Sequence, residues 1–455
     1  MHAFTRKTGL QALDTKSNKT FPMNLYDIFL QHPVVTTDSR NCPAGSIFFA
    51  LKGESFNANE FAAKALENGC SYAVIDEKQF AVDERYILVE DVLKAMQNLA
   101  NTHRKALKTK IIGITGTNGK TTTKELIAAV LQEKFNLHFT RGNLNNHIGV
   151  PLTLLQLNAS HDLAVVEMGA NHPGEIEFLC NICEPDFGII TNVGKAHLEG
   201  FGSFEGVMKT KAELYDFIVK NGKGIFINQD NNFLNSMADK SGVQEDLKIP
   251  YSLTKKDDPS VTFGRVFASS PLLEVICHEN IDEPVLIQTQ LIGSYNAENV
   301  LAAVTIGQFF GLSNDQIKSG LEKYQPQNNR SQLTITSKNK LVVDAYNANP
   351  TSMKAAIQNF AEMQVNGKVL ILGDMLELGE QTETEHLQVI ELLKQGKFEQ
   401  VFLVGKVFNA LHHPFISFEN KDILTEEIKN HPLEDKFILI KGSRGIQLEK
   451  VIPFL

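Results

Sequence analysis

The chain is organised around one glycine-rich turn, which lies between a short apolar run and a helix-forming run. Residues 111–123 read IIGITGTNGKTTT. The apolar start of this stretch is typical of a buried strand, and residues 124–134 have the composition of a helix. Glycines in such a turn let backbone N–H groups approach phosphate oxygens, and the positive end of the helix dipole attracts their charge. The turn therefore predicts a phosphate-binding loop in an α/β domain.

Two side chains of this loop could contact the nucleotide or its metal ion. The ammonium of Lys120 can reach the β- and γ-phosphates of a nucleotide, and the hydroxyl of Thr121 can ligate Mg²⁺. The usual loop spacing places a glycine where this chain has Ile114. A glycine turn that binds nothing is the alternative, but the flanking strand and helix favour nucleotide binding. The expected nucleotide contacts are Gly116, Thr117, Asn118, Gly119, Lys120, Thr121 and Thr122.

Composition limits the classes of partner. A chain of 455 residues is too long for one core and indicates several domains. Its net charge of −9 argues against nucleic acid, although a phosphorylated small molecule needs only a local cationic pocket. No apolar run approaches the roughly 20 residues of a membrane span, and the start lacks the apolar core of a signal peptide. We therefore expect a cytoplasmic monomer that binds small molecules; its five scattered cysteines fit a reducing compartment.

Expected strands and helices alternate along the chain after a polar leader. The central order predicts a doubly wound, mostly parallel sheet, and the last part predicts a Rossmann-like α/β domain. Residues 261–293 are interpreted as a β-rich insertion, and Cys180 and Cys183 as core residues of a helix. The expected divisions are a disordered leader at 1–23, a small α/β domain at 24–108, a central domain at 109–325 and a C-terminal domain at 326–455.

Polar residues follow the expected central strands, at the edge where doubly wound folds bind ligands. Glu167 ends one strand and could hold Mg²⁺, while His197 follows the next strand. Asn145 and Asn146 lie in an amide-rich loop before a helix. Each residue alone has a structural alternative, because a strand-end glutamate is usually on the surface and a lone histidine is usually structural.

Lys211 interrupts an apolar stripe on the helix expected at residues 204–220. Val207, Leu214 and Ile218 are apolar positions of the same face. A lysine in such a stripe usually extends its ammonium to water. The alternatives are a buried partner or a modified amine, since a carboxylate on that nitrogen would turn a cation into an anion able to ligate Mg²⁺. The pattern alone favours the ammonium in water.

The C-terminal domain carries polar strand ends but no second phosphate loop. The sequences DAYNANP at 344–350 and KGSR at 441–444 follow expected strands, as does Asp374. A second α/β domain of this kind indicates a lid that brings a second substrate to the nucleotide.

Taken together, these motifs resemble those of the Mur ligases, the ATP-dependent amide-bond-forming enzymes of bacterial cell-wall synthesis. The similarity covers residues 24–455 in the family's order. DAYNANP resembles the branch that joins D-alanyl-D-alanine to UDP-N-acetylmuramoyl-tripeptide. Branches adding a dibasic residue typically carry Asp-Asn-Pro-Arg or Asp-Asn-Pro-Ala, and this chain has no such run. The matching stretches are 115–122, 140–154, 167–169, 192–197, 293–303, 344–350, 373–379 and 441–444.

The resemblance implies roles for individual residues. Lys211, in TKAEL, matches the family's carbamylated lysine, and Lys120 matches the phosphate-loop lysine. Glu167 and His197 match the metal-binding residues, with Thr121 as the loop ligand of Mg²⁺. The implied ATP contacts outside the loop are Asn296, Arg330 and Asp344. The implied substrate contacts are Ser39 and Arg40 at the UDP end, Asn145 and Asn146, and, toward the second substrate, Asn347, Asn349, Lys441, Ser443 and Arg444.

The reaction that the resemblance implies transfers the γ-phosphoryl group of ATP to the terminal carboxylate of the tripeptide. The amine of D-alanyl-D-alanine then attacks the acyl phosphate and releases phosphate. One departure lies at residues 57–59, which read Asn-Ala-Asn where relatives commonly have Asp-Gly-His. The alternatives are another amide ligase of this superfamily, adding a dibasic residue or glutamate to folate, and a phosphate-loop NTPase without ligase activity.

Overall fold

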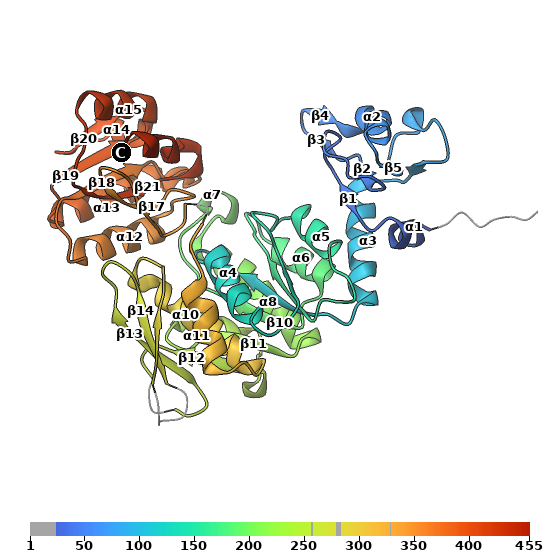
Figure 1. Ribbon diagram of the computed structural model, residues 1–455, viewed down its shortest axis with the longest axis horizontal. Helices are drawn as coiled ribbons and strands as arrows, with labels where there is room; N and C mark the ends of the chain where they lie inside the picture. Colours follow the sequence, from blue (N-terminus) through green and yellow to red (C-terminus); the bar gives the residue numbers. More distant parts are fainter. Residues whose placement is uncertain (1–23, 256–257, 279–283, 328) are drawn as a thin grey trace, which may run out of the picture. The chain divides into compact units, whose positions relative to one another are not determined.

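The computed structural model describes residues 24–255, 258–278, 284–327 and 329–455 (Figure 1). The expected leader at 1–23 lies outside these residues. The chain forms two compact units, the first ending at Ala95 and the second beginning at Met96, and each is described by itself. Within the described residues, no helix combines the length and apolar character needed to cross a bilayer.

The first unit contains a four-stranded parallel sheet in the order β1-β2-β5-β6. Its central strand is apolar and fully buried. A 3₁₀ turn, Ala58–Phe61, precedes the first helix after β4, and the Asn57 side chain caps that turn. The elements are α1 (Leu25–Gln31), β1 (Val35–Thr36), β2 (Ile47–Phe49), β3 (Lys52–Gly53), β4 (Phe56–Asn57), α2 (Ala62–Glu67), β5 (Tyr72–Ile75), β6 (Tyr86–Leu88) and α3 (Val92–Ala106), which continues into the second unit.

The second unit begins with a nine-stranded sheet in the order β15-β14-β13-β12-β11-β10-β7-β9-β8. Strands β7 to β13 pair with one another in parallel, which confirms the doubly wound prediction. Residues expected to form an insertion at 261–293 instead continue this sheet, because β13 pairs with β12 and starts an antiparallel edge. The strands are β7 (Lys110–Thr115), β8 (Leu137–Phe139), β9 (Leu163–Glu167), β10 (Phe187–Ile190), β11 (Gly224–Asn228), β12 (Lys248–Ser252), β13 (Thr262–Ala268), β14 (Glu274–His278) and β15 (Val285–Gln288).

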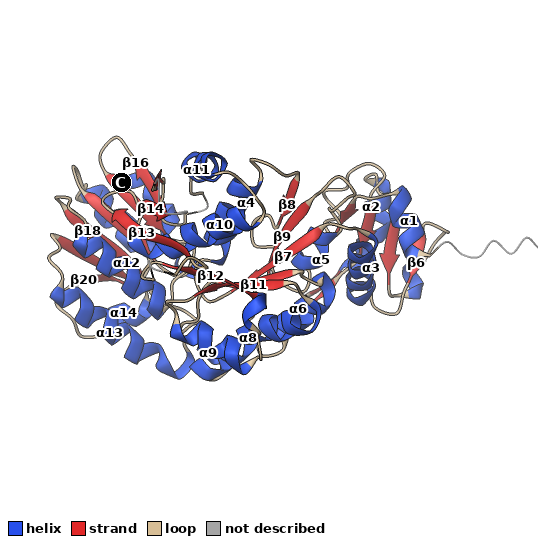
Figure 2. Ribbon diagram, turned by 90° about the horizontal axis from the view of Figure 1, so that it is seen from below, coloured by secondary structure: helices blue, strands red, loops and turns tan. Residues whose placement is uncertain are grey.

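Helices cover both faces of the nine-stranded sheet. Figure 2 shows α4, α10 and α11 on one face and α6, α8 and α9 on the other. Cys180 and Cys183 are buried beside the sulfur of Met168, as expected for core residues. The bounds are α4 (Lys120–Leu131), α5 (Gly149–Leu154), α6 (Glu175–Cys183), α7 (Leu198–Phe201), α8 (Phe204–Asn221), α9 (Asn232–Lys240), α10 (Ala297–Phe309) and α11 (Asn314–Lys323).

The remaining part of the second unit is built on a six-stranded sheet in the order β16-β17-β21-β18-β19-β20. Only β16 runs antiparallel to its neighbour, so the Rossmann-like prediction is confirmed. Its strands are β16 (Gln332–Ile335), β17 (Lys340–Asp344), β18 (Lys368–Gly373), β19 (Gln400–Val404), β20 (Ile416–Phe418) and β21 (Phe437–Lys441). Its helices are α12 (Pro350–Glu362), α13 (Thr382–Gln395), α14 (Lys406–Ala410) and α15 (Lys421–Asn430).

Candidate active site

The glycine-rich turn joins the end of β7 directly to α4, which begins at Lys120 rather than at the expected position 124. Gly116 and Gly119 have φ angles of 143° and 77°, which L side chains rarely adopt. A Cβ on Gly116 would lie 2.0 Å from the Thr191 Oγ1. The turn therefore requires glycine at this position for both conformation and space.

Contacts with the loop after β10 hold the turn in place. The Thr117 N–H donates to the Asn192 carbonyl at 2.9 Å, and the Asn118 N–H donates to the Asn192 Oδ1 at 3.0 Å. The Lys120 Nζ donates to the carbonyl oxygens of Gly116 and Thr117 at 2.7 and 3.0 Å. Burial lowers the pKa of Lys120 to about 8, against the opposing effect of the Glu167 charge. The lysine therefore reaches over the loop, where a phosphate would meet it.

Glu167 ends β9 next to this loop and is only 1% exposed, so the surface alternative is wrong. Its Oε1 accepts hydrogen bonds from the Thr121 Oγ1 at 3.2 Å and the Asn145 Nδ2 at 2.9 Å. Its Oε2 is buried and has no hydrogen-bond partner among the described residues. The structure thus brings together the residues expected to hold a metal or to contact substrate.

Lys124 is a neighbour of this carboxylate that the sequence reasoning missed. Its side chain is fully buried in α4, with the Nζ 3.0 Å from the Glu125 Oε1 and 3.7 Å from the Glu167 Oε2. A buried carboxylate is costly without a cation nearby, so Lys124 offsets the charge of Glu167. The available signal was a lysine in the helix sequence KTTTKELIAAVL, between hydroxylic residues and an apolar run.

Lys211 lies inside the protein rather than at the surface. Its residue is 2% exposed and its Nζ lies 5.3 Å from the ring centroid of Phe201, so the interpretation as an ammonium in water is wrong. Burial, followed by the charge of Lys120, lowers the pKa of Lys211 to about 7. Among the described residues, Lys211 makes no ion pair. A neutral amine is therefore available near pH 7.

The loop after β10 also contacts the C-terminal part of this unit. His197 pairs through its Nδ1 with the Glu377 Oε2 at 2.5 Å, and burial lowers the pKa of its ring. Lys195 donates to the Oε1 of Glu385 at 2.8 Å, whose side chain is 3% exposed. The sequence carried no signal for either carboxylate partner, because each lies far along the chain, Glu377 in the loop after β18 and Glu385 in α13.

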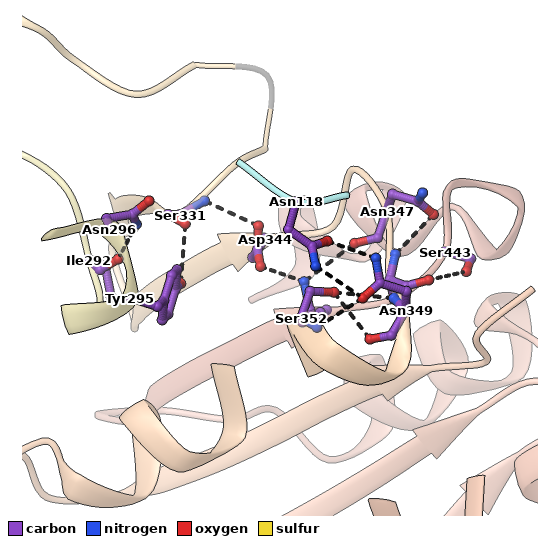
Figure 3. A network of polar contacts seen from close by, with 12 residues as sticks. Asn118, Ile292, Tyr295, Asn296, Ser331, Asp344, Asn347, Asn349, Ser352 and Ser443 are labelled. Atoms are coloured by element: carbon purple, nitrogen blue, oxygen red, sulfur yellow. Dashed lines mark hydrogen bonds and ion pairs between the residues drawn. The ribbon is translucent and has the colours of Figure 1, made fainter. Parts of the chain in front are cut away.

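The DAYNANP stretch meets the phosphate loop through a pair of amides (Figure 3). The Asn349 Nδ2 donates to the Asn118 Oδ1 at 2.7 Å, while Asn349 also caps α12. Asp344 pairs with the buried ammonium of Lys441, and the same ammonium donates to the Asn347 carbonyl at 3.3 Å. These contacts bring the expected C-terminal residues to the nucleotide loop.

These groups line one cavity of about 730 Å³. Gly116, Lys211, Ser443 and Arg444 are expected residues that do not line it. The Ser443 hydroxyl instead bonds the backbone of Ala348 and Leu376. Ser39 and Arg40 belong to the first unit, where Arg40 forms a two-bond ion pair with Asp38. The expected residues that do line the cavity are Thr117, Asn118, Gly119, Lys120, Thr121, Thr122, Asn145, Asn146, Glu167, His197, Asn296, Arg330, Asp344, Asn347, Asn349 and Lys441.

Several of these side chains already have partners in the protein. The Asn146 Oδ1 accepts from the N–H groups of Ile148 and Gly149, and the Asn296 Nδ2 donates to the Ile292 carbonyl. Arg330 stacks on Tyr346, with 3.6 Å from its Cζ to the ring centroid. The cavity therefore combines one cationic loop, one buried carboxylate and a planar stacked pair.

Comparison with known proteins gives consistent matches. Residues 114–307 match the Mur ligase middle domain, and residues 329–444 match the family described as Mur ligase, glutamate ligase domain. The chain is 36% identical over 427 residues to the UDP-N-acetylmuramoyl-tripeptide–D-alanyl-D-alanine ligase of Escherichia coli, covering 92% of this chain and 93% of that protein. Identity to the enzyme of that name from Bacillus subtilis is 34% over 440 residues, covering 92% of each. The crystal structure of MurF from Acinetobacter baumannii is similar with a TM-score of 0.81 and 31% identity, covering 92% of each chain.

Gly116→Ala should abolish tight nucleotide binding, because its Cβ would collide with Thr191 and the loop would have to move. We expect ADP affinity to fall at least tenfold, about 1.4 kcal/mol, in isothermal titration. Gly142→Ala is a matched control, since Gly142 also has a positive φ of 57° but has no atom within 4 Å of an added Cβ. Equal ADP affinity in the two variants would contradict this role of Gly116.

Lys195→Met should destabilise the protein, because it leaves the buried Glu385 carboxylate without its cation. An unsatisfied buried group costs about 1–3 kcal/mol, which thermal unfolding should detect as a lower midpoint. Adding Glu385→Gln removes the buried charge that Lys195→Met leaves without a cation, and should restore part of the lost thermal stability. Strictly additive midpoint shifts in the double variant would show that these two side chains are not coupled.

Proposed function

The chain belongs to the Mur ligase family, and from this premise we propose that it joins D-alanyl-D-alanine to UDP-N-acetylmuramoyl-tripeptide with cleavage of ATP. The products would be ADP, phosphate and UDP-N-acetylmuramoyl-pentapeptide, a precursor of peptidoglycan. The observation that carries the proposal is the single cavity in which the phosphate loop, Glu167 and the DAYNANP stretch come together. It supports an ATP-dependent peptide ligase, which we propose acts in the cytoplasm.

In the first step, the terminal carboxylate of the tripeptide attacks the γ-phosphorus of ATP, which gives an acyl phosphate and ADP. The two reactants are anions, so cations must offset their repulsion. Lys120 lies on the phosphate loop with a pKa lowered to about 8 by burial, and a bound phosphate would favour its charged form. In the second step, the dipeptide amine attacks the acyl carbon, and phosphate leaves from the tetrahedral intermediate.

The residues around Glu167 fit Mg²⁺, which prefers oxygen ligands. Glu167 offers a buried Oε2 without a hydrogen-bond partner among the described residues, and Thr121 offers a hydroxyl. Those residues include no group of three His, Cys, Asp or Glu side chains suited to a metal, so further ligands would come from a carbamate on Lys211 and from His197. When bound, Mg²⁺ neutralises charge on the phosphate oxygens.

Lys211 is proposed to react with CO₂ as a neutral amine, which forms a carbamate and releases a proton. The pKa of about 7 supports this step, because an ordinary lysine amine is almost fully protonated at neutral pH. The carbamate would replace a buried cation by an anion. It would also remove the positive charge of Lys211, which opposes that of Lys120.

The other assigned residues place the contacts with the substrates in three proposed domains, residues 24–108, 109–325 and 326–455. Ser39 and Arg40 would contact the UDP end, and Asn145 and Asn146 the peptide. Asn296, Arg330 and Asp344 would hold ATP. Lys441 and Asn349 support a second-substrate side in the C-terminal part, because they line the same cavity as the phosphate loop. Ser443 and Arg444 would shape that side from outside the cavity. We propose that the enzyme acts as a monomer.

A substrate panel tests the reaction. Phosphate release from ATP should require both UDP-N-acetylmuramoyl-tripeptide and D-alanyl-D-alanine, and mass spectrometry should find the pentapeptide. Lys120→Ala should abolish release while the thermal midpoint stays near that of the parent protein. Turnover with lysine or glutamate in place of the dipeptide would favour another ligase of the family, and release without an amine would favour an NTPase.

Lys211→Ala should lower kcat by about a hundredfold or more, because the anionic group near the phosphates is lost. Added formate or acetate should restore part of the activity by occupying the vacated space. Carbon-13 NMR after incubation with labelled bicarbonate should detect a carbamate in the parent protein and not in the variant. Lys209→Ala removes an exposed lysine of the same helix and should keep both the signal and the rate; a fully active Lys211→Ala enzyme would exclude this role.

A further inference from the structure

We divide the lining of the cavity into two sides, called arms, according to the strands that the lining residues follow on either side of the phosphate loop. Strand β7 lies between β9 and β10, and the parallel strands of this sheet all end at the same edge. Residues that follow β8 and β9, such as Asn145 and Glu175, line the first arm. Residues that follow β11 and β12, Asn231 and Leu253, line the second arm together with the start of α10.

The direction of a bound nucleotide follows from this arrangement and rests on the proposed function. Glu167, the proposed metal carboxylate, ends β9 and therefore belongs to the first arm. The γ-phosphate must lie toward that arm, because the metal and the acceptor acid meet it there. The α-phosphate and the nucleoside then extend away from Glu167, into the second arm.

The second arm suits a flat base. Arg330 and Tyr346 stack on each other in the lining of the same cavity, and planar side chains of this kind stack on nucleobases. The Tyr295 hydroxyl lies 3.2 Å from the Ser331 Oγ, so the residues beside Arg330 adjoin the turn that starts α10 (Figure 3). Leu253 adds an apolar surface to the same arm.

Glu298, in the first turn of α10, lines this arm. It has no ion pair with any described residue, whereas Asp344, another carboxylate of the cavity lining, is paired with Lys441. The nearby Asp230 is occupied, since its oxygens accept from the Ser252 and Thr254 hydroxyls and the Leu253 N–H. Burial raises the pKa of Glu298, and the adjacent Asn228 amide partly offsets that rise.

A carboxylate without an ion pair repels phosphate, so the part of the nucleotide that it contacts must be a hydrogen-bond donor of the nucleoside. Adenine carries a donor at its 6-position, the amino group, whereas guanine carries an acceptor there, the O6 oxygen. We infer that Glu298 is the residue that selects the base, by accepting a hydrogen bond from the 6-amino group of adenine. Guanine would place its O6 against the carboxylate oxygen and be rejected.

The test compares nucleotide binding by the full chain and its Glu298 variants in isothermal titration. The parent protein should bind ADP at least a hundredfold more tightly than GDP. Glu298→Gln presents an N–H as well as a carbonyl, so GDP should bind at least tenfold more tightly than to the parent while ADP changes less. Glu298→Leu should lower the affinity for ADP about tenfold. Glu419→Gln removes an exposed carboxylate elsewhere and should match the parent.

Two nucleotide analogues identify the group that Glu298 contacts. Purine riboside 5′-diphosphate lacks the 6-amino group, so the parent and Glu298→Leu should bind it equally. If Glu298→Leu lowered the affinity for this analogue and for ADP equally, the carboxylate would contact a group other than the 6-amino group. The same would follow if the variant no longer lowered affinity for 2′-deoxy- or 3′-deoxy-ADP, because the carboxylate would then contact the ribose. Either result would overturn the inference. Unchanged ADP and GDP affinities in both Glu298 variants would also overturn it. Failure of the parent protein to bind any nucleoside diphosphate would instead contradict the proposed function.

Discussion

The hydrogen bond from Thr121 to Glu167 joins the phosphate loop to the neighbouring strand, and the geometry of the cavity depends on it. A carboxylate that is 1% exposed must be surrounded by donors or cations, because its desolvation is costly. Thr121 supplies one donor from α4, Asn145 supplies another from the loop before α5, and Lys124 supplies a cation. Satisfying this one charge therefore fixes three segments of the chain around the phosphate loop.

Two lysines whose charges interact, Lys120 in the cavity lining and Lys211 outside it, lack full charge compensation. Burial lowers the pKa of Lys120 to about 8 and of Lys211 to about 7, and the two charges oppose each other. Arrival of a polyanion reverses that balance and favours the charged form of Lys120, so part of the electrostatic repulsion inside the free protein is relieved on binding. Conversion of Lys211 to an anion would act in the same direction, since it removes one of the competing positive charges.

Local patterns were enough to predict most of the fold and the phosphate loop. The apolar runs that became β7, β11 and β19 are continuous and buried, and the glycines of the loop have no other common use. Strands β8 and β12 were not predicted, because neither is a continuous apolar run: β8 reads LHF and β12 reads KIPYS. Burial of Lys211 was also hidden, since the neighbour that covers it, Phe201, comes from a separate helix. Ion pairs such as Lys195 with Glu385 join distant segments, and no local pattern encodes them.

The contacts between the phosphate loop and the C-terminal sheet are polar in character, which bears on how the second substrate enters. Asn118 meets Asn349 through two amides, and Lys195 meets Glu385 across the same boundary. Polar contacts of this kind exchange with water at small net cost, in contrast to the apolar cores on either side. Separation of the C-terminal part from the loop would also have to expose Ile292, which precedes the start of α10 and packs in the core of the C-terminal part. Because Asn349 also caps α12, any such motion would carry the DAYNANP stretch as a unit with the helix behind it.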